Sequence, residues 1–230
     1  GEADEGVGVT ELARAMDMDK GSVSRVMQTL AQQGFAEQDP STRRYTLGPQ
    51  LVVLGQRLLA RMPLRDQAHP YLRQLVDATG ECAHLAVAAQ GQVLYVDQVE
   101  SAATLRVNTG VGTLAPMHST ALGKCLMAFG NAAIPEPLTA FTTRTITSAE
   151  ALKLHLEQTR RQGYAIDDEE YSYDVRCVAV PVINHQNQVV AAIGISGPAG
   201  RMGLERLPEL ASVVREIGTA LSNRLSFKRG

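Results

Sequence analysis

The sequence predicts an α+β protein in which a small winged helix-turn-helix domain precedes a larger antiparallel sheet covered by helices. Two short helical segments and a turn-rich hairpin come first, and a strongly apolar helical segment follows them. Beyond Pro63, strand-like segments joined by short turns alternate irregularly with amphipathic helices, which is typical of antiparallel sheets with helices packed on them. We expect a winged helix-turn-helix over residues 1–48, a linker helix over residues 49–63 and the larger domain over residues 64–230.

The composition indicates a soluble globular chain. Its 230 residues are 44% hydrophobic and 20% charged, and no apolar run approaches the ~18 residues of a membrane-spanning helix. The acidic, glycine-rich start lacks the basic and apolar regions of a secretory signal. The three cysteines are widely spaced and odd in number, which favours a reducing compartment over a disulfide framework. We therefore expect a cytoplasmic protein without a membrane partner.

Positive charge gathers near the start of the chain, although the formal net charge is −2. Six basic and two acidic residues lie between Lys20 and Arg61. Contact with nucleic acid depends on the local field rather than on the average charge. A net acidic chain can therefore still present a basic face to DNA.

Two helices are expected before the hairpin. Thr10 could cap a short helix with the sequence ELARAM, and Asp19 is placed to cap a second helix that starts at Lys20 or Gly21. Gly34 is expected as the C′ residue that ends this second helix.

The second helix has one apolar and one polar face. Residues at the spacing of one helical face should pack against a core: Val23, Val26, Met27 and Leu30. The other face, with a lysine at its start, carries donors suited to phosphates and base edges: Lys20, Ser22, Ser24, Arg25, Gln28 and Thr29.

A hairpin follows, because the turn sequence Asp39-Pro40-Ser41 separates two short strand-like segments. Arg43 and Arg44 should lie on or near its tip, within reach of phosphate or the minor groove. An amphipathic helix pair with a solvated polar face would explain the helices alone, but the ordered combination with a basic hairpin favours a DNA-binding winged helix-turn-helix. The segment GEADEGVG cannot supply the helix that normally precedes this arrangement, so we expect the first helix to be missing.

The apolar segment LVVLGQRLLARM, residues 51–62, predicts a helix that Pro63 ends. Its stripe of Leu51, Leu54, Leu58 and Met62 is flanked by further apolar residues, so two faces need to be buried. A dimer contact would bury them and would also provide two half-site readers. Packing on its own domain explains the pattern equally well.

In the larger domain, turn and cap signals divide the chain into elements. Gln90-Gly91 predicts a hairpin between two strands, Ser119 or Thr120 can cap a helix, and Gly163 should end another helix that opens with a capping box at Thr147. The expected elements are helices over 67–80, 121–129, 151–163 and 207–227 and strands over 82–89, 92–100, 104–109, 177–183 and 188–197.

Five segments in this order resemble the IclR family of transcription regulators. They are VTELARAMDMDKGSVSRVMQTLAQQGF, YTLGPQLVVLG, LRVNTGVGTLAPMHSTALGKCLMAF, RRQGYAIDDEE and RCVAVPVINHQNQVVAAIGISGP, and the resemblance runs from about residue 9 to the end of the chain. It implies a winged helix-turn-helix, a linker helix and a GAF-like effector domain. It also implies homodimers or dimers of dimers that bind double-stranded operator DNA as repressors or activators, under the control of a small organic molecule, often a carboxylate.

Three features indicate where an effector would bind. The loop into HSTALGK places free backbone N–H groups at a helix N-terminus, which favours an anion. Cys177 begins an otherwise apolar strand, and the hydroxyl of Ser196 on a neighbouring strand can donate to an oxyanion. The resemblance maps the effector contacts onto Ser119, Ala121, Leu122, Asp167, Cys177 and Ser196, with apolar walls from Leu105, Val107, Ala115 and Met117.

Gly194 occupies a position where the family often has a second hydroxyl. Its smaller size predicts a bulkier or less polar effector than glyoxylate or pyruvate.

Two other functions remain as alternatives. Cys82, His84, Cys125 and His118 suggest a thiol or metal site, but no further ligands lie at the usual spacing. LGKC lacks the P-loop frame, and there is no nucleophile elbow. We therefore expect no catalytic residue, cofactor or metal, and an enzyme is the less favoured alternative. A ligand-sensing or dimerisation module without a DNA role is the other.

Overall fold

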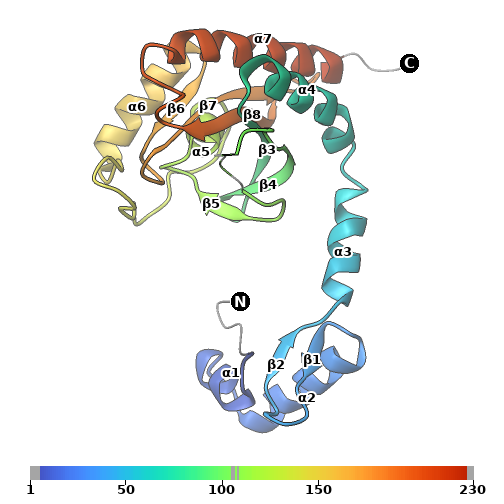
Figure 1. Cartoon of the computed structure of the whole chain (residues 1–230). Helices are drawn as coiled ribbons and strands as arrows, with labels where there is room; N and C mark the ends of the chain where they lie inside the picture. Colours follow the sequence, from blue (N-terminus) through green and yellow to red (C-terminus); the bar gives the residue numbers. More distant parts are fainter. Residues whose placement is uncertain (1–5, 105–106, 108, 227–230) are drawn as a thin grey trace. The chain divides into compact units, whose positions relative to one another are not determined.

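The computed structural model describes residues 6–104, 107 and 109–226. The chain divides into two compact units, Gly1–Met62 and Pro63–Gly230, and each is described by itself (Figure 1). None of the described helices is both long enough and apolar enough to cross a lipid bilayer.

The first unit has the order of a winged helix-turn-helix, as predicted. Its elements are α1 (Val9–Ala15), α2 (Lys20–Gln32), β1 (Ala36–Gln38), β2 (Tyr45–Leu47) and α3 (Gln50–Leu59). The strands β1 and β2 form an antiparallel hairpin in which Ala36 lies opposite Leu47. The turn between α1 and α2 and the short hairpin after α2 confirm the fold class of this part.

Local signals place the ends of α2 correctly. The Asp19 carboxylate accepts a hydrogen bond from the Ser22 N–H at 2.9 Å, and Gly34 adopts the left-handed conformation, φ 75°, just beyond the helix. The predicted Thr10 cap of α1 is wrong. Gly8 is the N-cap, and the Glu11 carboxylate accepts from the Gly8 N–H, so that Thr10 lies inside the first turn.

Much of the apolar surface of this unit is exposed. In α2 only Val23 is buried, whereas Val26 and Leu30 are 49% and 36% exposed, so the prediction that the whole stripe faces a core is wrong. The described elements of this unit are too few and too short to cover both sides of α2. No residue of α3 is buried either, and Val52 is 66% exposed.

The second unit is built on a six-stranded antiparallel sheet in the order β5-β4-β3-β8-β7-β6. Its elements are α4 (Pro63–Thr79), β3 (Cys82–Ala89), β4 (Gln92–Val99), β5 (Leu114–Pro116), α5 (Ala121–Phe129), α6 (Ala149–Gln162), β6 (Ala165–Asp168), β7 (Val175–Ile183), β8 (Val189–Pro198) and α7 (Leu207–Ser226). The antiparallel sheet with its packed helices confirms the α+β class.

The helices cover the two faces of the sheet separately. Helices α4 and α7 pack against each other and against the central strands, and α5 lies against β6, β7 and β8 with α6 beside it (Figure 1). Val180 and Ile193 lie opposite each other and face Gly218 of α7. Because side chains alternate along a strand, Cys177 and Ser196 project to the other face, where α5 lies.

Most predicted elements are present, including the Gln90-Gly91 hairpin with both residues at positive φ and the left-handed Gly163 after α6. The helix α4 starts earlier than predicted, at Pro63, and α6 is capped by Ser148 rather than Thr147. The strands β5 and β6 were not predicted, since short edge strands have a weak period-2 pattern. The predicted strand over 104–109 includes residues 105, 106 and 108, which lie outside the described residues, and Val107 and Thr109 are not in a strand.

Candidate functional site

A concave surface of the first unit joins α2 to the hairpin. Five of the predicted DNA contacts line it: Lys20, Ser24, Gln28, Arg43 and Arg44. The other three lie together on α2, where Arg25 donates to the Ser22 hydroxyl and the Thr29 hydroxyl donates to the Arg25 carbonyl. Five of the eight predicted residues therefore line the groove, and the other three form an adjacent strip on α2.

Arg44 is held within the unit. Its guanidinium donates to the Glu11 carboxylate, at 2.9 Å for the shorter contact, and to the Gly6 carbonyl. Only about a third of its side chain is exposed, 34%. Arg44 therefore ties the hairpin to α1, whereas Arg43 beside it is exposed.

The tip of the hairpin is fixed by one carboxylate. Asp39 Oδ1 accepts from the Ser41 N–H and hydroxyl and from the Thr42 N–H, at 2.6–2.8 Å. These hydrogen bonds lower the pKa of Asp39 to about 2, and the Ser41 hydroxyl contributes most. The turn that holds Arg43 is therefore ordered at any physiological pH.

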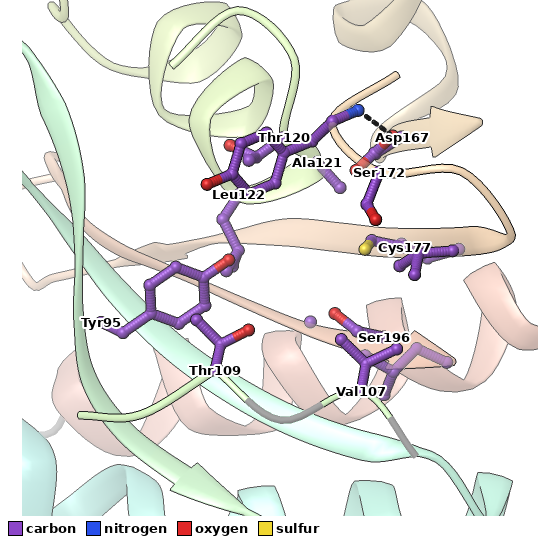
Figure 2. A pocket seen from close by; sticks show the side chains of 15 residues that line it. Tyr95, Val107, Thr109, Thr120, Ala121, Leu122, Asp167, Ser172, Cys177 and Ser196 are labelled. Atoms are coloured by element: carbon purple, nitrogen blue, oxygen red, sulfur yellow. Dashed lines mark hydrogen bonds between the residues drawn. The ribbon is translucent and has the colours of Figure 1, made fainter. Parts of the chain in front are cut away.

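In the second unit, a pocket of about 200 Å³ lies between the N-terminus of α5 and the strands β6–β8 (Figure 2). Six of the predicted effector contacts line it: Val107, Ala121, Leu122, Asp167, Cys177 and Ser196. Leu105 lies outside the described residues. Ala115, Met117 and Ser119 are at most 1% exposed and do not line the pocket, because they belong to the packed core or precede the helix cap.

Sheet register brings three polar side chains into one row on the pocket floor. Asp167 of β6 lies opposite Cys177 of β7, which in turn lies opposite Ser196 of β8. Directly opposed residues project to the same face of a sheet. Burial raises the pKa of the Cys177 thiol well above its usual value.

The N-terminus of α5 forms the wall above this row. The Thr120 hydroxyl caps the helix by accepting from the Gly123 N–H at 3.1 Å. The N–H groups of Ala121 and Leu122, in the first turn, have no carbonyl within the helix to bind. They line the pocket at the positive end of the helix dipole, which is a favourable place for an anion.

The pocket also has lining residues that the sequence alone did not indicate: Tyr95, Thr109, Thr120, Tyr171, Ser172, Val175, Val178 and Ile195. Several of them carry hydroxyl groups. One is Tyr95 of β4, and burial raises the pKa of this phenol above its usual value. Alternation along β4 shows that Tyr95 shares a face with Val93, but it does not show that α5 covers this face. These hydroxyls make the pocket more polar than its strands suggest.

A buried ion pair lies behind the pocket. Lys124 of α5 has no exposed side-chain area and donates a short hydrogen bond to Glu170, which is 5% exposed. Burial raises the pKa of Glu170, and the Lys124 charge opposes this. Burial likewise raises the pKa of Asp167 to about 7, although Lys124 is again the nearest opposing charge.

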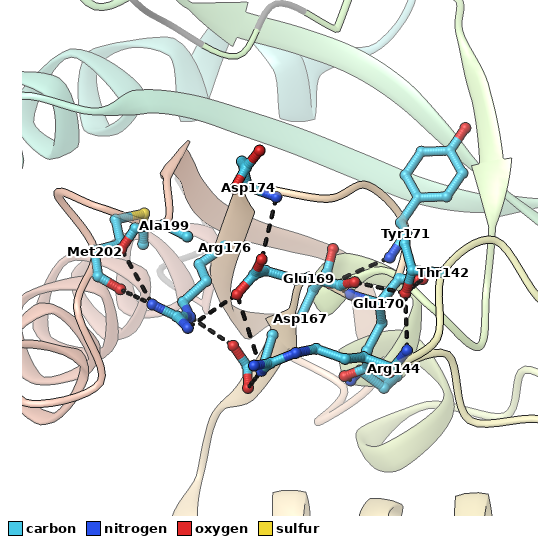
Figure 3. A network of polar contacts seen from close by, with 12 residues as sticks. Thr142, Arg144, Asp167, Glu169, Glu170, Tyr171, Asp174, Arg176, Ala199 and Met202 are labelled. Atoms are coloured by element: carbon cyan, nitrogen blue, oxygen red, sulfur yellow. Dashed lines mark hydrogen bonds and ion pairs between the residues drawn. The ribbon is translucent and has the colours of Figure 1, made fainter.

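The loop between β6 and β7 covers one side of the pocket and is held by two arginines (Figure 3). Arg176 donates to Asp168 and Glu169 and to the carbonyls of Ala199 and Met202. Arg144 donates to the other oxygen of Asp168 at 2.6 Å. Through these contacts the outer side of the loop is fixed, while its inner side lines the pocket.

Gly194 lines the pocket and also has a packing role. A Cβ at this position would lie 2.2 Å from the Val178 carbonyl oxygen and 2.9 Å from the Ala179 Cα. The glycine is therefore required by the close approach of β7 and β8. The bulkier or less polar effector stays a prediction.

Comparisons with known proteins cover both units. The model of the Bacterial transcriptional regulator IclR C-terminal family matches residues 56–223, and that of the IclR helix-turn-helix domain matches residues 1–40. The chain is 34% identical to the HTH-type transcriptional regulator XynR of Escherichia coli, over 95% of this chain and 89% of that protein. It is 35% identical to the glycerol operon regulatory protein of Streptomyces coelicolor, over 97% and 90%. The crystal structure of the Thermotoga maritima IclR matches with a TM-score of 0.72 and 31% identity, over 98% of this chain and 94% of that one.

The packing at Gly194 predicts a specific loss of stability. Gly194→Ala should lower the free energy of unfolding by about 1–3 kcal/mol, because β7 must move to admit the methyl group. Gly200→Ala is the matched control, since nothing lies within 4 Å of its added Cβ. Urea unfolding of the two variants measures the difference, and equal stabilities would show that the strand contact is not tight.

The buried pair predicts a second effect. Lys124→Met should destabilise the protein by about 3–5 kcal/mol at neutral pH, because Glu170 loses its cation in a buried site. The loss should be smaller at acidic pH, where Glu170 is protonated in both the folded and the unfolded chain. The double variant Lys124→Met/Glu170→Gln should recover most of the stability, and a double variant as unstable as the single one would contradict the pairing.

Proposed function

The chain belongs to the IclR family of bacterial transcriptional regulators, and from this premise we propose that its second unit senses a small organic acid that alters operator binding by the first. It is a DNA-binding regulator and not an enzyme, as its relatives are regulators. The observation that supports the acid is that the first residues of α5, Ala121 and Leu122, line the same pocket as Ser196. This arrangement suits a carboxylate.

The size of the pocket limits the acid. A dry cavity of ~150 Å³ is enough to bind benzene, and this pocket has about 200 Å³. An acid of roughly six to ten non-hydrogen atoms would fit this space. The hydroxyls of Tyr95, Thr109 and Ser172 could bind polar groups on the remainder of the molecule.

On the DNA side, we propose that α2 enters the major groove as the second helix of a helix-turn-helix. Arg25 and Gln28 are then available for base edges, while Lys20 and Arg43 contact phosphates. Arg44 would act through the hairpin that it ties to α1.

We further propose a homodimer. The apolar side chains of α3, such as Val52 and Leu58, are 66% and 61% exposed, and a second copy would cover them. A two-fold axis would also place two copies of α2 on two half-sites.

Screening of acids by thermal shift tests the effector class. An acid that binds should stabilise the protein by about 2.7 kcal/mol at a concentration of about 100 Kd. Each acid is compared with its amide and its alcohol, which lack the charge. Stabilisation by the neutral compounds alone would contradict the proposal.

Ser196 should contribute to the affinity for the acid. Ser196→Ala should weaken binding at least tenfold, the equivalent of about 1.5 kcal/mol for a hydrogen bond to a charged group. Ser226→Ala, in the exposed last turn of α7, is the control. Calorimetric titration of both variants gives the difference.

Salt dependence tests the DNA-binding surface. Operator affinity, measured by fluorescence anisotropy with DNA from upstream of the gene, should fall with salt. Arg43→Ala should reduce the log–log slope by about 0.9 for the one phosphate contact that is lost, whereas Arg25→Ala should lower the affinity through the loss of a base contact. Charge reversal at both positions should abolish binding. Arg44→Ala should lower the affinity and leave the slope unchanged, because its charge is bound to Glu11.

Arg73→Ala, an exposed position of α4, is the control for the loss of a positive charge outside this surface. Unchanged binding by the doubly reversed variant would refute the assignment of the surface.

A further inference from the structure

Asp167 presents a difficulty for an acid-binding pocket, because it is the only carboxyl group among the described residues that line it. No lysine, arginine or histidine is among these lining residues to balance it. We infer that the acid is taken up together with one proton, which Asp167 holds and donates to the carboxylate of the acid. The inference rests on the proposed acid-sensing function and adds a specificity-determining group to it.

The hydrogen bonds of Asp167 indicate which of its oxygens carries the proton. Oδ1 accepts from the Glu170 N–H at 2.8 Å and from the Tyr171 N–H at 3.4 Å. An oxygen that already accepts two N–H groups is a poor site for a proton, so the proton belongs on Oδ2. The side chain is 1% exposed and shares its face of the sheet with Cys177 and Ser196, so its carboxyl group meets the pocket rather than solvent.

The charges around Asp167 explain why it is this group that is neutral. Lys124, whose charge acts on Asp167, is in direct contact with Glu170, and the pair has no net charge. An ionised Asp167 would then be an unbalanced buried anion, which is costly. Glu170 is held by the lysine, so a proton entering the cluster goes to Asp167.

The other titratable groups near the cluster do not add charge at neutral pH. Cys177 on β7 and Tyr95 on β4 have pKa values raised by burial and are protonated. His155 of α6 has its pKa lowered to about 4 by burial and by the charge of Lys124, so it is neutral too.

A bound carboxylate would strengthen this preference. Two carboxyl groups in contact share one proton, since both cannot be ionised side by side. The proton on Oδ2 then forms a charge-assisted O–H···O hydrogen bond to the acid, while the α5 N–H groups and Ser196 bind its remaining lone pairs. Because the acid raises the pKa of Asp167 above its value in the free protein, binding takes up a proton in mildly alkaline solution.

The pH dependence of acid binding tests the inference. Sodium pyruvate, sodium benzoate and the acids found in the thermal-shift screen are titrated calorimetrically between about pH 6 and pH 9, in buffers of different ionisation enthalpy. We expect a constant Kd below about pH 7 and a roughly tenfold weaker Kd per pH unit above it, with roughly one proton taken up per acid.

Three variants distinguish the effect of Asp167 on the pH profile from the effects of neighbouring carboxyl groups. Asp167→Asn, which keeps a neutral donor, should bind acids with a Kd independent of pH and without proton uptake. Glu170→Gln should free Lys124 to stabilise ionised Asp167 and so move the bend in the profile to lower pH. Asp174→Asn, an exposed change in the same loop, should leave the profile unchanged.

Titration of the free wild-type protein, without any acid, tests the inference even if the variants fail to fold. In the free wild-type protein, the ¹³C signal of the Asp167 carboxyl carbon should titrate near neutral pH, and titration below about pH 5, as in an ordinary aspartate, would overturn the inference. Acid binding without proton uptake at alkaline pH would overturn it while leaving the acid-sensing function intact. Binding by no acid at all would overturn both.

Discussion

The antiparallel register of β6, β7 and β8 is the constraint on which the pocket depends. It places Asp167, Cys177 and Ser196 side by side on three strands that are separated by loops and turns in the sequence. A slip of one residue in either pairing would turn one member of the row to the face covered by α7. Gly194 contributes to the same constraint, because its missing side chain allows β7 to approach β8 closely. The contacts that stabilise the sheet therefore also form the binding site.

The β6–β7 loop has no apolar core of its own, and ion pairs hold the residues with which it lines the pocket. Glu169 has a positive φ of 60°, a conformation that non-glycine residues adopt at a cost. Its carboxylate, with that of Asp168, binds Arg176, whose side chain is only 9% exposed. A buried arginine is stabilised only when its donors are satisfied, and here carboxylates and backbone carbonyls satisfy them (Figure 3). The loop is thus fixed from its outer side, which leaves Tyr171 and its neighbours free to meet a ligand.

The sequence predicts most of the fold, because caps, turns and periodicity are local signals. Asp19 and Gly163 mark helix ends by their own chemistry, and the structure has both where they were expected. Periodicity identifies an apolar face but not its partner, and so the exposure of Val26 could not be predicted. Long-range contacts are the other gap. The sequence predicts a phosphate contact for Arg44, and only the structure shows that Glu11, distant in sequence, binds it. Tyr95 likewise reaches the pocket through the pairing of β4 with β3, which the sequence does not show.

Because titratable groups are distributed unequally between the two units, an effect of pH on the pocket can be distinguished from an effect of pH on the DNA-binding surface. All five histidines lie in the second unit, and the groove of the first is lined by lysine, arginine and neutral polar residues besides Glu11. Histidine is the side chain whose ordinary pKa lies near neutral pH, and none is among the described residues that line this groove. An effector can alter DNA affinity only by binding two arrangements of the protein unequally, and this coupling is reciprocal. If a proton enters the pocket with the acid, the effect of a fixed acid concentration on the operator must itself vary with pH. Since no histidine is among the described residues that line the groove, this variation would originate in the second unit, where Asp167 lies.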